Sequence, residues 1–131
     1  MTAGLSAVNL ANAWLNTMRN TSASSFTAPT DLFIQCHTGD PGASGTANVS
    51  TGIATRTVAD WAAASAGSMA LTATVAFSAT GSDTITHVSV WSASTAGTFY
   101  YSAALSASKA VTNGDTLNLT ALTFALTPIA A

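Results

Sequence analysis

The sequence contains very little charge, and this scarcity excludes several classes of protein. Only three Lys or Arg and five Asp occur in 131 residues, there is no Glu, and the formal net charge is −2. Charged residues make up 6% of the chain, whereas a typical soluble domain is about 25% charged. Nucleic-acid binding requires clustered Lys and Arg, and Arg19, Arg56 and Lys109 are scattered along the sequence. We therefore expect no nucleic-acid partner.

Other absences narrow the choice further. Cys36 is the single cysteine, so no intrachain disulfide can form. No apolar run approaches the roughly 20 residues of a membrane span, and no basic segment followed by a solid apolar stretch indicates a secretion signal. Two His and no Glu leave few groups for acid–base catalysis. We expect neither an enzyme, nor a bound cofactor, nor a membrane partner.

Small neutral residues are abundant instead, because Ala, Ser and Thr make up about half of the chain. Hydroxyl groups keep such a surface hydrated, but a net charge near zero promotes association. An Ala-rich core also removes less apolar area from water per residue than a core of larger side chains. Both properties favour a homo-oligomer.

Residues 1–20 are expected to form an N-terminal helix. Leu5, Val8, Leu15 and Met18 recur at a spacing close to 3.6 residues, with Trp14 beside Leu15. We expect the face made by these five residues to dock on a neighbouring subunit.

Residues 31–131 are expected to form an antiparallel β-sandwich or barrel, which makes the whole chain, 1–131, a single domain. Alternating apolar and small polar residues predict strands at 31–38, 53–58, 71–78, 85–91, 98–105 and 116–127. Asn113-Gly114 is a strong hairpin signal before the last strand. Both alternating sets are apolar or small in several strands, which indicates cover on both faces. The expected core or subunit-contact residues are Phe77, Val88, Val90, Phe99, Leu117, Leu119 and Phe124.

Three kinds of site deserve comparison with a purely structural role. Cys36, His37, Asp40 and His87 have the chemistry of metal ligands, but adjacent strand residues point to opposite faces, so we expect no metal site. The many serines include no Gly-x-Ser-x-Gly elbow, so we expect no catalytic residue. A carbohydrate-binding module is the remaining alternative. It would require exposed rings at Trp91, Tyr100 and Tyr101, whereas aromatic strand residues are more often core or interface anchors.

Two motifs resemble a family of small structural proteins of tailed bacteriophages. The first is the apolar strand 32–36 followed by His37-Thr38-Gly39-Asp40-Pro41-Gly42, and the second is Thr86-His87-Val88-Ser89-Val90-Trp91. The resemblance implies a place in the virion, assembled in the host cytoplasm, and no catalytic residues. Asp40-Pro41-Gly42 is also a favourable turn sequence, and we expect loop 39–52, with Asp40 and Pro41, to contact a partner.

These observations lead to one hypothesis with two alternatives. The chain is predicted to be a decoration protein that cements the head surface of a tailed phage, in contact with the major capsid protein or other virion proteins. The first alternative is a minor tail or tail-fibre component. The second is the carbohydrate-binding module.

Overall fold

The computed structural model describes residues 3–19 and 26–126, in which antiparallel strands follow one N-terminal helical segment. The helical segment consists of a π-helical turn, Ala7–Ala11, and helix α1, Asn12–Met18. The strands are β1 Leu32–His37, β2 Thr57–Ala59, β3 Ser68–Ala70, β4 Val75–Ser78, β5 Asp83–Trp91, β6 Phe99–Val111, β7 Thr116–Leu119 and β8 Thr123–Ala125. The predicted class, mainly β with one N-terminal helix, is confirmed.

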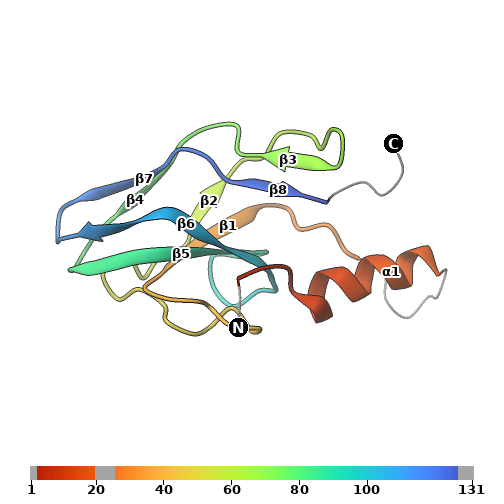
Figure 1. Cartoon of the computed structure of the whole chain (residues 1–131), viewed down its shortest axis with the longest axis horizontal. Coiled ribbons are helices and arrows are strands. Elements are labelled where there is room, and N and C mark those ends of the chain that lie inside the picture. Colours follow the sequence, from red (N-terminus) through yellow and green to blue (C-terminus); the bar gives the residue numbers. More distant parts are fainter. Residues whose placement is uncertain (1–2, 20–25, 127–131) are drawn as a thin grey trace.

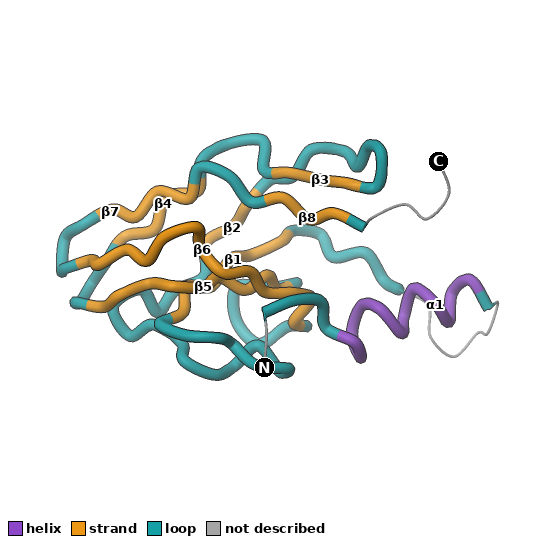
Figure 2. The backbone as a smooth tube through the Cα atoms, in the orientation of Figure 1, coloured by secondary structure: helices purple, strands orange, loops and turns teal. Residues whose placement is uncertain are grey.

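The strands form two layers. The first is a four-stranded sheet in the order β2-β1-β5-β6, and the second consists of two ribbons, β3-β8 and β4-β7. In Figure 1 the ribbons lie above the four-stranded sheet, the loops that follow β1 lie below it, and α1 extends to one side. Figure 2 shows how much of the lower layer is loop without regular structure.

The central strands are buried on both faces, as their composition predicted. Ile34 and Cys36 of β1 belong to the apolar core that the sheet shares with Phe77 of the ribbons. Gln35 and His37 alternate with them and are also buried, beneath the loop that follows β1. A strand covered on both sides lacks the usual alternation of apolar and polar residues, which explains the pattern of this segment.

The helical segment begins later than the sequence predicts. Leu5 forms a β-bridge with Tyr101, and the Ser6 amide donates a hydrogen bond to the Tyr100 carbonyl. This pairing keeps residues 4–6 extended, and the Ser6 hydroxyl accepts a hydrogen bond from the Asn9 amide at the start of the first turn. Residues 1, 2 and 20 of the predicted helix lie outside the described residues.

The predicted hairpin at Asn113-Gly114 is wrong. Gly114 does occupy a turn, with φ of 93°, but β6 and β7 do not pair after it. Instead β7 pairs with β4, from Val75 opposite Leu119 to Ser78 opposite Thr116. Ala79, the residue after β4, holds the turn. The Gly114 amide donates a hydrogen bond to the Ala79 carbonyl, and the Ala79 amide donates one to the Asp115 carbonyl. The two strands that the turn joins therefore diverge.

The predicted core residues fall into two groups. Phe77, Val88, Val90 and Phe99 are buried, as expected. Leu117, Leu119 and Phe124 are only half-buried and pack against the core from its margin. The strand predicted at 116–127 is also interrupted, because β7 ends at Leu119 and β8 begins at Thr123.

Candidate interaction surfaces

The two phage-like sequence motifs meet in a buried hydrogen-bonded chain. His37 at the end of β1 lies 2.6 Å from the Ser89 hydroxyl through Nε2 and 2.9 Å from the Ala47 carbonyl through Nδ1. The Trp91 indole nitrogen donates to the same Ser89 hydroxyl at 2.7 Å. These contacts join loop 38–56 to the sheet.

The partners determine where each proton lies in this chain. A carbonyl only accepts, so His37 donates from Nδ1 to Ala47, and in the neutral ring Nε2 then carries no proton. Ser89 therefore donates to His37 Nε2 and accepts from the Trp91 indole. Burial lowers the pKa of His37, which favours the neutral ring that this arrangement requires.

Arg56 covers the face of Trp91. Its guanidinium carbon lies 3.7 Å from the Trp91 ring centroid, and its Nη1 donates to the carbonyls of Ala93 and Ala96. Its Nε donates to Gln35 Oε1. The stacked cation thus holds loop 92–98 against the sheet.

The carbohydrate-binding alternative is overturned by the burial of its rings. Trp91, Tyr100 and Tyr101 are 5%, 7% and 4% exposed. Sugar stacking needs an open ring face, and Arg56 already occupies one face of Trp91. The rings are structural anchors.

A second anchor holds the loop that follows β1 from its other end. Asp83 at the start of β5 accepts hydrogen bonds from the Ser50 and Thr51 hydroxyls and from the Gly52 amide. The Gly52 and Ser50 hydrogen bonds lower the pKa of this carboxyl. These hydrogen bonds hold the end of the loop against β5.

Asp40 and Pro41 have internal roles in the structure. The Asp40 carboxylate accepts from the Gly42 amide at 2.8 Å, which closes a turn. Pro41 is fully buried. Its ring is therefore not available to a partner in this arrangement.

Cys36 and His37 point into different environments. Cys36 lies in the apolar core, and burial raises its pKa to about 12. His37 faces the loop layer. Within residues 3–19 and 26–126, no group of three or more His, Cys, Asp or Glu is arranged to hold a metal ion.

The helical segment presents exposed apolar side chains. Val8, Leu15 and Met18 are 76%, 62% and 83% exposed. We refer to these three residues as the helix ridge. Of the other two residues of the predicted face, Trp14 packs on aromatic rings within the chain, whereas Leu5 is paired with Tyr101 through its backbone and its side chain is 37% exposed.

Trp14 fastens the helix to the sandwich through an aromatic cluster. Its ring centroid lies 6.1 Å from those of Phe26 and Phe124, both in edge-on geometry. Tyr101 stacks at 4.6 Å on Phe124. An apolar hollow of about 210 Å³ lies among these rings. Helix α1 has no buried residue between Asn12 and Met18, so it is attached by this cluster together with buried Leu10 of the preceding turn.

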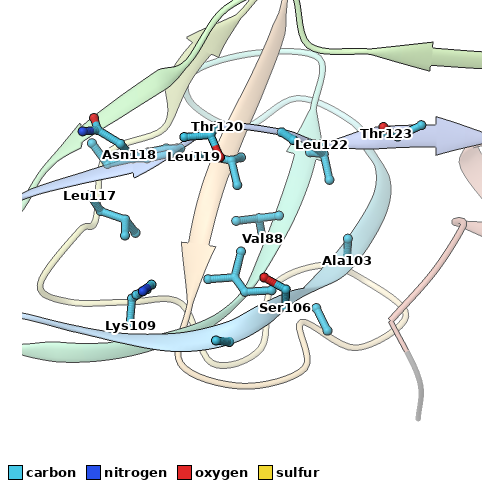
Figure 3. Close-up of a pocket in the computed structure, with 15 residues that line it drawn as sticks. Val88, Ala103, Ser106, Lys109, Leu117, Asn118, Leu119, Thr120, Leu122 and Thr123 are labelled. Atoms are coloured by element: carbon cyan, nitrogen blue, oxygen red, sulfur yellow. The ribbon is translucent and has the colours of Figure 1, made fainter.

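An apolar groove opens between β6 and β7. It has a volume of about 520 Å³, and its lining includes buried Phe77 and Val88 at its floor. Figure 3 shows Leu117, Leu119 and Leu122 on one side of Val88, and Ala103, Ser106 and Lys109 of β6 on the other. Sequence reasoning missed this groove, because the hairpin expected at Asn113-Gly114 would have closed it.

A β-sandwich with two uncovered apolar surfaces has features typical of a protein that works through protein contacts. No helix in the described part of the chain is long and apolar enough to cross a membrane. The chain belongs to the family described as podophage GP4 fiber I protein gp80, whose model matches residues 5–127. It is therefore a structural protein of a phage virion. A search of curated proteins finds no match.

Proposed function

We propose that the chain is a non-enzymatic subunit of a fibre on the phage particle, and that the helix ridge attaches it to a neighbouring virion protein. The description of its family supports the fibre alternative over head decoration. The helix ridge is the observation that carries the attachment. It places three large apolar side chains on a segment that extends beyond the sandwich (Figure 1).

Attachment through the ridge would be favourable because of the area it removes from water. Fully burying a Val, Leu or Met side chain contributes about 1.5–3 kcal/mol. Arg19 is the one charged residue among the described residues 3–19. Contacts of this kind depend little on salt, unlike surface ion pairs. The partner is an apolar surface on another virion protein, met during assembly in the host cytoplasm.

The test is incorporation of ridge variants into particles. The double variant Leu15→Lys, Met18→Lys keeps the aromatic attachment of Trp14 but places two charges on the ridge. Phage lacking the natural protein are supplied with this variant or with Asn12→Lys, a control at an exposed position of the same helix. We expect the control to enter particles and the ridge variant to remain in the unassembled fraction.

The same experiment distinguishes failure of folding from failure of attachment. Circular dichroism of each purified variant shows whether the sandwich is intact. A folded ridge variant that enters particles as well as the natural protein would overturn attachment through the ridge. The fibre assignment would stand or fall separately, on where the protein lies in the particle.

A further inference from the structure

The groove between β6 and β7 is part of a longer opening along one side of the sandwich. A second hollow, of about 290 Å³, lies between β6 and β8 and shares Ala103 and Thr123 with the groove. We call this continuous opening the open side. It exposes the margin of the core wherever β6 has separated from β7 and β8.

Backbone edges without partners flank the open side. In the described part of the chain, β6 is the last strand of its sheet, and β7 pairs with β4 alone. The extended residues 4–6 cover the outer edge of β6 at positions 100–102. Further along β6, residues 105–108 have no paired residue in β5, because the register shifts there and Thr86 is the one β5 residue opposite these four. Such edges favour pairing with another chain.

The edge carries few of the features that prevent pairing. β6 is 13 residues long, whereas a typical strand has about 5–6 residues. Its open half has no Pro, and Lys109 is its one charge. The bulge at residues 105–108 bends the strand, but most of the side chains there are small and exposed. Another strand can therefore approach closely.

We propose that two copies of this chain pair open side to open side about a two-fold axis. The β6 edges lie next to each other and extend the four-stranded sheets, while the β7 edges face each other in the second layer. Leu117 and Leu119, half-buried in one copy, become covered by the other. The surface is the same on both copies, as a two-fold interface requires. The inference does not depend on the fibre assignment.

A second copy fits the charge of this surface. With antiparallel β6 strands centred on Ala107, each Lys109 lies opposite Leu105 of the other copy. The two cations then lie on opposite sides of the axis, and no like charges face each other directly. A strongly acidic or basic partner would find almost no complementary charge here, because Lys109 is the only charged residue among the described residues that line the groove.

The size of the open side also fits a dimer of modest affinity. Eight strand residues span about 27 Å. With two layers about 10 Å apart plus their side chains, the open side measures roughly 27 by 20 Å. Two such surfaces bury about 1,000 Å² in total, which is the lower limit for a specific interface.

The first test is the oligomeric state of the full chain by analytical ultracentrifugation over a range of concentrations. Ala107→Lys places two ammonium groups across the axis at an exposed position, so it should raise the dimer Kd about tenfold or more. Ala64→Lys, in an exposed loop away from the open side, is the matched control and should dimerise like the natural chain. Circular dichroism checks that both variants fold.

A second variant decides the matter even if Ala107→Lys fails to fold. Ala107→Cys treated with a short bifunctional thiol cross-linker should form a covalent dimer, because directly opposite residues have Cβ atoms only about 4.5–5.5 Å apart. Cys36 is buried and contributes no background. A natural chain that stays monomeric, an Ala107→Lys dimer of unchanged affinity, or no cross-link at position 107 would overturn the proposal. Dissociation by Leu15→Lys alone would also overturn it, in favour of the helix ridge.

Discussion

Replacing Ser89 by Ala is the sharpest test of the buried chain that joins the two motifs. Ser89 donates to His37 and accepts from Trp91, and all three side chains are buried. The variant fills nearly the same space but leaves an unprotonated imidazole nitrogen and an indole N–H without partners. Each buried polar group left unsatisfied costs about 1–3 kcal/mol.

The expected loss is therefore about 2–6 kcal/mol, a large part of the 5–15 kcal/mol typical of a domain. Urea unfolding followed by Trp fluorescence measures it, and the midpoint should fall without a change in m-value. Ser94→Ala, at an exposed position in loop 92–98, is the control and should change stability by less than about 0.5 kcal/mol. A Ser89→Ala loss below about 0.5 kcal/mol would refute both the proton assignment and the claim that these buried hydrogen bonds stabilise the fold.

The buried hydrogen bonds of His37 also predict how the stability of the protein depends on pH. Burial lowers the pKa of His37 below 6.5, with smaller contributions from the nearby His87 and Arg56 charges. The unfolded chain then binds the proton more readily than the folded chain, so stability should fall as pH decreases from about 6.5. Hydrogen bonds lower the pKa values of Asp83 and Asp115, so protonation of these carboxyl groups reduces stability only near and below pH 4. His37→Asn should remove the upper transition; a decline near pH 6 that persists in this variant would contradict the assignment.

Three further variants test the packing. Phe77→Ala should cost about 3–5 kcal/mol in urea unfolding, because the ring is 1% exposed in the core; a loss below about 1 kcal/mol would show that the core lies elsewhere. Gly45→Ala should shorten the lifetime of loop 38–56 against proteolysis, because φ is 73° and a Cβ would meet the Phe99 ring; unchanged cleavage would contradict this. Tyr101→Phe should keep or raise the melting temperature, because the buried Tyr101 hydroxyl has no hydrogen-bond partner among residues 3–19 and 26–126; a clear decrease would reveal a partner for it.

The sequence predicts the parts of this fold that depend on local pattern. The strand at 31–38 follows from a short apolar run, and its burial on both faces follows from two apolar or small alternating sets. Loop 39–45 follows from Gly and Pro. The motifs around His37 and Trp91 are also visible as sequence, but their contact joins residues 52 positions apart. That contact depends on the register of β1 and β5, which no local signal supplies.

The largest errors arise where distant segments compete with local preference. Asn113-Gly114 is a strong turn signal and does form a turn, but Ala79 takes the backbone hydrogen bonds beside it. The 3.6-residue spacing of apolar residues likewise predicts that Leu5 is helical, but pairing with Tyr101 keeps Leu5 extended. The groove exists because β7 joins β4 instead of β6.

The position of the protein on the particle tests the central claim most directly. Purified phage are labelled with an antibody against this chain and viewed by electron microscopy, with particles lacking the protein as the control. The fibre proposal predicts label confined to the fibres. Label spread evenly over the head surface would contradict it and favour the decoration hypothesis.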